Sequence, residues 1–172
     1  FKDTLVEADP ELAVTFVDNH DTQYGQALES WILDWFKPMA YALILLREKG
    51  YPCVFYGDLY GLKHNNIEPV NELKTLIDLR KEKSYGNQND YFDNPHCIGW
   101  TREGDDDHIK SGLAVLISNQ NDEEKRMYIG TNMSGEKFID AIGDIEEEVF
   151  IDEYGYGTFK VKAKSVSVWI NA

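Results

Sequence analysis

The sequence has few cysteines and no long apolar run, and both absences narrow the class of protein. Its 172 residues include only Cys53 and Cys97, which are too few for a disulfide framework and form no Cys-x-x-Cys pair. The longest apolar run, Met39–Leu46, is far shorter than the roughly 20 residues that a membrane-spanning helix needs. The sequence therefore predicts no membrane helix. Cys53, inside an apolar strand-like run, is expected to be a buried, inert thiol.

Positive charge is also scarce. The chain has 17 Lys and Arg against 31 Asp and Glu, a formal net charge of −14. Nucleic acid and anionic membrane surfaces repel such a protein, so neither is expected as a partner. Neutral polar ligands such as sugars fit this charge better, although charge alone does not select them. A hydrophobic fraction of 42% is typical of a globular chain with one good core or two small ones.

The sequence does not begin with an initiator methionine. It opens on Phe1, and Phe1–Val6 is neither a signal peptide nor a basic leader, so we expect it to be part of a longer polypeptide. Two unpaired cysteines slightly favour the cytoplasm. Secretion is the alternative, because a signal peptide would lie in the preceding part, and localisation stays open.

The first half of the chain alternates strand and helix. Leu12–Val17 is predicted to be a strand, and a helix follows with Pro38 in its first turn and Gly50 as its stop. Pro52–Tyr56 is predicted to be a second strand, followed by a helix from Pro69. Buried strands separated by helices pair in parallel with a right-handed crossover. Two such units would be a fragment of a larger sheet, since alone they leave sheet edges uncovered.

From about residue 85 the helical period disappears. Short apolar segments with turn residues between them predict strands, and the last two alternate strictly. Phe159, Val161 and Ala163 are expected to face the core, and so are Val166, Val168 and Ile170, opposite a wet face. This pattern favours an antiparallel sandwich. The predicted strands are Cys97–Arg102, Gly112–Ser118, Arg126–Gly130, Lys137–Ile142, Glu148–Ile151, Thr158–Lys162 and Ser165–Ile170.

The first predicted strand leads directly into Asp18-Asn19-His20-Asp21. In open parallel sheets and in barrels, ligands bind at the carboxyl ends of the strands. The adjacent imidazole and carboxylate of His20 and Asp21 are therefore a candidate site. The alternative is that Asn19, His20 and Asp21 form a turn that caps the next helix.

Four segments together resemble the α-amylase family, glycoside hydrolase family 13, and its bacterial liquefying-type enzymes in particular. Phe16–Asp21 resembles the fourth conserved region of that family. The similarity runs on to Ser165–Ile170, and the other three segments follow in the same order: Trp35–Ala42, Gly50–Asp58 and Gly99–Gly104.

The resemblance implies a definite architecture. Residues 1–84 would be the end of a catalytic (β/α)8 TIM barrel, contributing strands 7 and 8 with their helices. Residues 85–172 would be a C-terminal antiparallel Greek-key β-sandwich, usually called domain C. The expected fold class is thus α/β followed by all-β. The expected partners are the missing N-terminal barrel portion and an α-glucan.

The resemblance also implies a chemistry, endo-hydrolysis of α-1,4-glucosidic bonds in starch or glycogen with retention. Retaining glycosidases use a carboxylate nucleophile and a carboxylic acid. In this family both lie on barrel strands 4 and 5, outside this chain, so the chain alone is expected to be inactive. Asp21 would be the third carboxylate, a transition-state stabiliser that holds the distorted sugar. His20 would donate to hydroxyls of the same sugar, and Gln23 is left unassigned.

Two other functions remain open. One is a maltooligosaccharide-forming amylase of the same family, because loops outside this chain largely set the product length. The other is a non-catalytic relative that serves as a carbohydrate-binding or partner scaffold. The presence of both His20 and Asp21 argues against the scaffold, which does not need the pair.

No cofactor or metal site is expected within this chain. Asp105–His108 lacks the spacing and the glycine of a calcium loop and is predicted to be a solvated turn. Liquefying-type amylases often bind calcium between the barrel and domain C, and the resemblance places His96 and Asn119 at two of the acidic ligand positions. Both are poorer ligands for a hard cation. We therefore expect this calcium to be absent or weak, and any other calcium in the whole enzyme to be held by missing residues.

Overall fold

The computed structural model describes residues 2–63 and 67–172, and the chain divides into two compact units. The first unit is Phe1–Ile77 and the second is Asp78–Ala172, so the division falls within a helix, somewhat before residue 84. The sequence around His64 predicts a loop, and this residue is outside the described residues. Within the described part of the chain, no helix is both long and apolar enough to cross a membrane.

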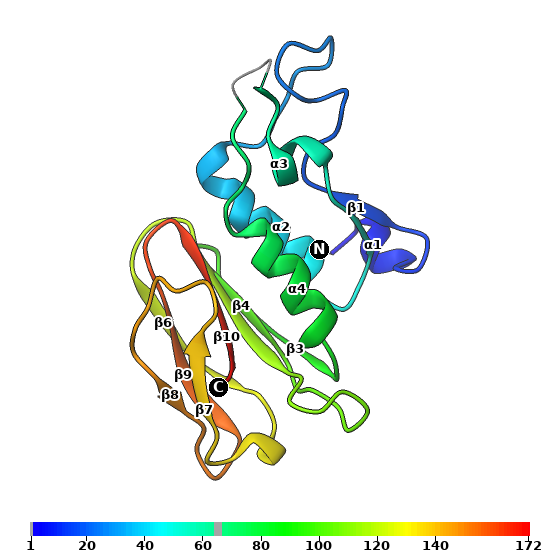
Figure 1. The fold of residues 1–172 in the computed structure, drawn as a ribbon. Coiled ribbons are helices and arrows are strands. Elements are labelled where there is room, and N and C mark those ends of the chain that lie inside the picture. The colour runs from blue at the N-terminus through cyan, green and yellow to red at the C-terminus, as the bar shows by residue number, and fades with distance from the viewer. Residues whose placement is uncertain (1, 64–66) are drawn as a thin grey trace. The chain divides into compact units, whose positions relative to one another are not determined.

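The first unit is a strand–helix–strand arrangement with short helices around it (Figure 1). Strand β1 pairs in parallel with β2, with Val14 opposite Tyr51 and Phe16 opposite Cys53. Helix α2 connects the two strands, which confirms the predicted parallel pairing. The elements are α1 (Leu5–Ala8), β1 (Val14–Phe16), η1 (Asp34–Phe36), α2 (Lys37–Leu45), β2 (Tyr51–Cys53), α3 (Tyr56–Tyr60) and α4 (Leu73–Glu82), the last of which continues into the second unit.

Helix α2 begins as predicted, because Pro38 lies in its first turn, where the missing N–H is not needed. Its end was predicted wrongly. The helix stops at Leu45, and Gly50 lies further on, in the turn before β2. Gly50 has a φ of +98°, and a Cβ there would lie 2.9 Å from the side chain of Thr15. The glycine is therefore required because this turn lies close to β1, and it does not end the helix.

Three other expectations for the first unit are wrong. Cys53 is exposed rather than buried, because β1 and β2 pair only with each other among the described residues; Val14 and Phe16 are exposed as well, as expected of a fragment of a larger sheet. Tyr56 begins α3 instead of extending the second strand. Helix α4 begins at Leu73 and not at Pro69.

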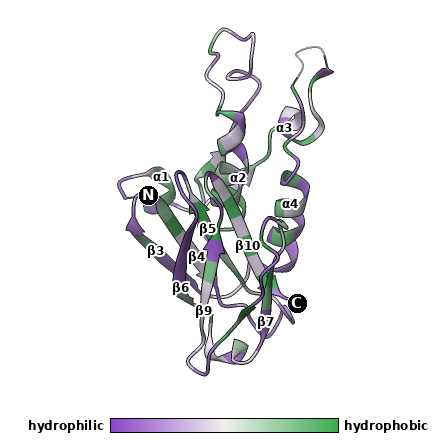
Figure 2. Cartoon of the chain, turned by 90° about the vertical axis from the view of Figure 1, so that its left-hand side faces the viewer, coloured by the Kyte–Doolittle hydropathy of each residue, from purple (hydrophilic) through white to green (hydrophobic). Residues whose placement is uncertain are grey.

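The second unit is an antiparallel β structure of two sheets. Six strands lie in the order β3-β4-β5-β10-β7-β8, and β6 pairs with β9. Between them lies an apolar core that includes Leu116, Met127, Phe138, Phe159 and Trp169. In Figure 2, β5 is largely hydrophobic and β6 largely hydrophilic. The strands are β3 (Gln88–Asn94), β4 (Cys97–Arg102), β5 (Leu113–Ser118), β6 (Glu123–Tyr128), β7 (Lys137–Asp140), β8 (Val149–Phe150), β9 (Tyr156–Val161) and β10 (Ser165–Asn171).

Most predicted strands of this unit are confirmed, but the predicted wet face of β10 is wrong. Ser167 and Trp169 are buried like Val166 and Val168 on the opposite face. Strand β10 is central, since it pairs with both β5 and β7. Ala163 is exposed because β9 has already ended at Val161.

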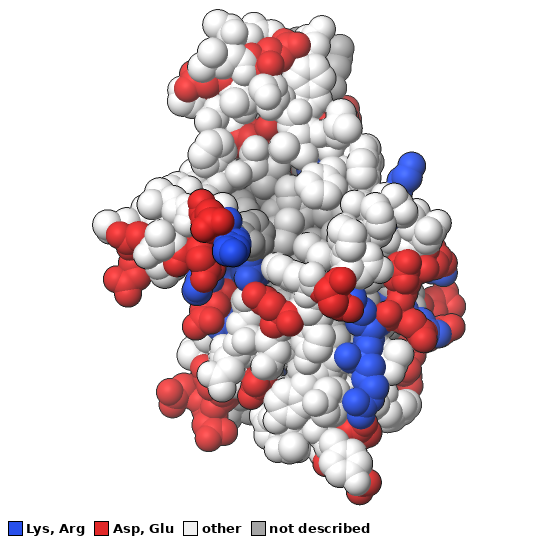
Figure 3. All heavy atoms as spheres, turned by 180° about the vertical axis from the view of Figure 1, so that it is seen from behind, with Lys and Arg blue, Asp and Glu red and all other residues white. Residues whose placement is uncertain are grey.

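Charged side chains cover the surface of the second unit in pairs. Lys125 lies 2.6 Å from Asp93, and Arg126 lies 2.6 Å from Asp152. Lys160 pairs with Glu147. On the face drawn in Figure 3, basic side chains lie beside acidic ones. Over the whole chain the acidic residues outnumber the basic ones, 31 against 17.

Candidate functional site

The candidate site begins with a tight turn directly after β1. The Asn19 side-chain oxygen accepts hydrogen bonds from the backbone N–H groups of Asp21 (2.9 Å) and Thr22 (3.0 Å). The Thr22 hydroxyl in turn accepts the N–H of Asn19 at 3.2 Å. This is an Asx turn, which the short Asn side chain forms readily. The alternative that these residues cap the next helix is wrong, since the next helical turn begins only at Asp34.

The turn presents His20 and Asp21 to solvent. The two side chains are 82% and 57% exposed, and His20 Nε2 lies 3.3 Å from Asp21 Oδ1. Gln23 donates through Nε2 to the backbone oxygen of His20 at 3.1 Å. The structure thus brings the two predicted site residues together at the carboxyl end of a parallel strand. In that position both side chains can reach a ligand.

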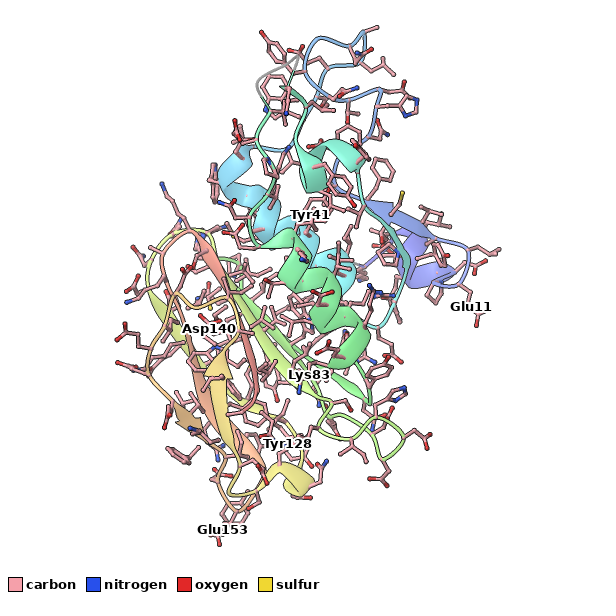
Figure 4. All side chains as sticks on the ribbon, in the orientation of Figure 1. Glu11, Tyr41, Lys83, Tyr128, Asp140 and Glu153 are labelled. Atoms are coloured by element: carbon pink, nitrogen blue, oxygen red, sulfur yellow. The ribbon has the colours of Figure 1, made fainter. Side chains whose placement is uncertain are left out.

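A buried ionic cluster lies at the bases of the loops that follow β1 and β2. Lys37 Nζ is 2.6 Å from Asp58 Oδ1 and 3.1 Å from Asp18 Oδ2. The Tyr41 hydroxyl donates to Asp58 Oδ2 at 2.6 Å and accepts the Phe55 N–H at 3.4 Å. Lys37, Tyr41, Asp18 and Asp58 are all buried, and Figure 4 shows Tyr41 on α2. We call these four residues the ionic cluster.

The ionic cluster controls the protonation of its own members. Burial alone would lower the pKa of Lys37, but the hydrogen bond and charge of Asp58, followed by those of Asp18, raise it above its ordinary value. Burial also raises the pKa of Tyr41, and the adjacent Asp58 raises it further. Lys37 therefore stays charged and Tyr41 stays a hydrogen-bond donor at neutral pH.

A pocket of about 480 Å³ lies beside the turn. The loop after β1 contributes Gln23 and Gln26 to it, and α3 contributes the exposed rings of Tyr56 and Tyr60. These two rings lie 4.8 Å apart. Amide groups next to aromatic faces suit a polyhydroxylated ligand, because the amides bond hydroxyls and the rings pack on the apolar faces of a sugar. The other lining residues are Gly61, Leu62 and Lys63.

Comparison with known proteins gives this geometry a context. Residues 113–170 match the family described as "Alpha-amylase C-terminal". Over 168 residues the chain is 50% identical to an α-amylase of Geobacillus stearothermophilus, covering 97% of this chain and 31% of that protein. The chain is a homologue of the bacterial α-amylases. It corresponds to the C-terminal portion of such an enzyme of glycoside hydrolase family 13.

A second relative of this α-amylase homologue is a glucan 1,4-alpha-maltohexaosidase of Bacillus sp. (strain 707). It is 45% identical over 172 residues, covering 99% of this chain and 33% of that protein. The crystal structure of an Anoxybacillus α-amylase shows the same fold, with a TM-score of 0.64 at 16% identity, covering 92% of this chain and 38% of that one. The chain thus spans about a third of the length of its relatives.

His96 and Asn119 stand at two positions where the resemblance implies acidic calcium ligands, and these two residues contact each other. His96 Nδ1 lies 3.1 Å from Asn119 Oδ1, and the Asn119 N–H donates to the His96 oxygen at 3.1 Å. The pair offers no carboxylate, and the Asn119 oxygen already has a partner. This donor set fits a hard cation poorly.

The sequence Asp105–His108 forms the solvated turn that was predicted. His108 Nδ1 lies 2.7 Å from Asp105 Oδ1, and both residues are exposed. No group of three or more His, Cys, Asp or Glu residues that could hold a metal is found among residues 2–63 and 67–172.

The ionic cluster was missed by sequence reasoning, although a signal for it exists. Lys37 and Tyr41 are four residues apart in an otherwise apolar helix, so they share one face of it. An Asp follows each of the two strands, at Asp18 and Asp58. A cation and a hydroxyl on a buried helix face need acidic partners, and these two carboxylates are the nearest candidates after the strands.

Proposed function

We propose that this chain is the C-terminal portion of an enzyme that hydrolyses internal α-1,4-glucosidic bonds of starch or glycogen with retention. The observation that carries the proposal is the exposed pair of His20 and Asp21 at the carboxyl end of β1. This pair lies within a chain that is 50% identical to an α-amylase over nearly its whole length.

In this proposal Asp21 accepts hydrogen bonds from hydroxyls of the sugar at the cleavage point. Its charge-assisted bonds strengthen as positive charge develops on the ring, so Asp21 stabilises the transition state more than the bound substrate. His20 donates to hydroxyls of the same sugar and, at 3.3 Å from Asp21, keeps that carboxylate oriented. The pocket lined by Tyr56 and Tyr60 would hold a further part of the glucan chain.

The nucleophile and the general acid belong to the barrel portion that this chain does not contain. The two-stranded sheet supports a partner of this kind. Val14, Phe16 and Tyr51 on β1 and β2 are each more than half exposed, although strands of parallel sheets are normally covered on both faces. Neighbouring barrel strands and helices would cover these side chains.

The test is a comparison of the 172-residue chain with a chimera. The chimera is the G. stearothermophilus α-amylase in which this chain replaces the aligned segment of 168 residues. We expect the chimera to release reducing ends from soluble starch as the α-anomer, and the chain alone to release none. Hydrolysis by the chain alone would contradict the proposal, and so would a folded chimera without activity.

A maltooligosaccharide-forming enzyme is a second candidate, favoured by the 45% identity to a glucan 1,4-alpha-maltohexaosidase. Loops outside this chain would largely decide between the two. A comparison of the product lengths of the parent α-amylase with those of the chimera shows whether this chain contributes to the choice of product length. Enrichment of a single oligosaccharide in the chimera alone would support the second candidate.

The contact between His96 and Asn119 supports a proposal about calcium. We expect no calcium to bind at these two positions, because the two side chains contact each other and neither of them is a carboxylate. The unfolding midpoint of the 172-residue chain should therefore be the same in excess calcium and in excess chelator. The same comparison of excess calcium with excess chelator is made for the parent α-amylase, and it shows whether the midpoint of that enzyme responds to calcium at its own sites. A rise of the chain's midpoint with calcium that disappears in His96→Ala would overturn this expectation.

A further inference from the structure

We propose that Lys37 is a positioning residue that clamps the loop bearing His20 and Asp21 to helix α3, which bears Tyr56 and Tyr60. This inference rests on the proposed function, because it concerns the same site. It begins from the fact that one buried ammonium group contacts carboxylates of two different segments, Asp18 at the end of β1 and Asp58 in α3.

The charges of the ionic cluster argue for positioning rather than for stability. One buried ammonium group faces the two buried carboxylates of Asp18 and Asp58, and the exposed carboxylate of Asp34 lies 4.0 Å away. Removing charges from water costs free energy that a buried ion pair often does not regain, so such a cluster is weak evidence for stability. What a buried ion pair does supply is a defined geometry, because a displaced partner leaves a charge uncompensated.

Asp18 is the anchor of the loop that carries the site. Its Oδ1 accepts the backbone N–H of Ile32 at 3.1 Å, which closes the loop from Asn19 to Trp31 at its base. Its Oδ2 has no hydrogen-bond partner of good geometry among the described residues apart from its 3.1 Å ion pair with Lys37. Lys37 thus fixes the orientation of the carboxylate that holds both ends of the loop.

Asp58 anchors the opposite wall of the pocket. It lies between Tyr56 and Tyr60 in α3, whose rings line the pocket together with Gln23. Its two oxygens are fixed by Lys37 (2.6 Å) and by the Tyr41 hydroxyl (2.6 Å), which both come from α2. Helix α2 therefore sets the distance between the two walls of the pocket through a single lysine.

The decisive variant is Asp18→Asn in the chimera. The amide keeps the size of the carboxylate and leaves Lys37 paired with Asp58, so the cluster becomes neutral and the variant is expected to fold. Its one oxygen, however, cannot serve both Ile32 and Lys37. We expect kcat on soluble starch to fall roughly 10- to 100-fold, since small misplacements of reacting groups have effects of this size, with an unchanged unfolding midpoint. Lys37→Met should show the same kinetic defect with a lower midpoint.

The control is Lys49→Met, which removes a surface ion pair with Glu7 (3.1 Å) in the same unit and should change neither kcat nor the midpoint. A merely structural cluster would lower the midpoint of Asp18→Asn and leave kcat intact, which would overturn the proposal.

Hydrogen exchange gives a readout that does not depend on activity. The amides of Asp21, Thr22 and Ile32 should exchange faster in Asp18→Asn, whereas unchanged exchange there would also contradict the clamp. If the chimera has no activity, the proposed function fails and the exchange result alone decides this inference.

Discussion

At the scale of single residues, Asp140 shows how one buried carboxylate organises the backbone around it. It lies at the end of β7 (Figure 4) and accepts three backbone N–H groups, from Val168 (3.1 Å), Ile142 (3.1 Å) and Asp144 (3.2 Å). Burial nevertheless raises its pKa above the ordinary value, because the N–H groups compensate only part of the lost hydration. The residue therefore joins the turn after β7 to the central strand β10.

This raised pKa predicts a pH dependence with a definite sign. The folded state binds the Asp140 proton more tightly than the unfolded state, whose pKa is about 3.9. Stability contributed by this group is therefore present at low pH and is lost as the pH rises through the folded pKa. The asparagine of Asp140→Asn does not titrate. The free energy of unfolding of the variant minus that of the wild type should therefore rise with pH from about 4. It should become constant above the pKa that Asp140 has in the folded state.

Urea denaturation at a series of pH values measures this difference. Titratable groups that do not interact with Asp140 are common to both proteins and cancel in the comparison. A difference that falls with rising pH would show that the N–H groups outweigh burial and that the pKa of Asp140 is lowered.

At the scale of elements, turns with a positive φ connect the strands of the second unit, and two of them form a matched pair. Gly155 and Gly135 have φ values of +83° and +79°. A Cβ on Gly155 would lie 2.6 Å from the backbone of Gly130, whereas a Cβ on Gly135 would meet nothing within 4 Å. The two positions thus share the same backbone strain and differ only in the space around them.

Alanine substitutions at these two positions should separate the free-energy cost of backbone strain from that of a steric clash. Gly135→Ala is expected to cost about 1 kcal/mol, the penalty of a left-handed backbone. Gly155→Ala should cost roughly 1–3 kcal/mol more, because backbone must move to admit the methyl group. Chemical denaturation gives both values. Equal losses would mean that the turn at Gly155 relaxes without cost.

Elements with a clear local pattern could be predicted from the sequence. Strand β4 was predicted with the bounds Cys97–Arg102 and β10 to within one residue, because apolar side chains and flanking turn residues mark them. Strand β3 was missed, since Gln88–Asn94 is polar and half-exposed and gains its strand character from pairing with β4. Helix α3 was missed because it is a single short turn after an apolar run.

The candidate site was predictable only in its exposed part. His20 and Asp21 are neighbours in the chain, so their approach follows from the turn that Asn19 forms. Lys37 and Asp58 are 21 residues apart, and their contact depends on how α2 packs against the segment after β2. The sequence marks the helix face that bears Lys37 and Tyr41, but it does not say which carboxylates meet that face, so the contact itself emerged only from the structure.

At the scale of the whole molecule, the exposed strands β1 and β2 predict where the proposed barrel portion would bind. Phe16→Lys should leave the stability of the 172-residue chain unchanged to within about 0.5 kcal/mol, as for most surface substitutions. In the chimera the same lysine would be buried without a partner and should lower stability by several times that amount. Ile109→Lys, in an exposed turn of the second unit, is the control and should be neutral in both. Thermal unfolding of the four variants and their parents measures these effects, and a neutral Phe16→Lys chimera would contradict the predicted contact.

The kcat of Asp21→Asn in the chimera tests the central claim most directly. If Asp21 stabilises the transition state, kcat on soluble starch should fall by roughly 10²- to 10³-fold, the effect of removing one such interaction. The unfolding midpoint should not change, because the side chain is exposed. Asp106→Asn, in the solvated turn of the second unit, serves as the matched control and should retain full activity. A kcat for Asp21→Asn equal to that of this control would contradict the account.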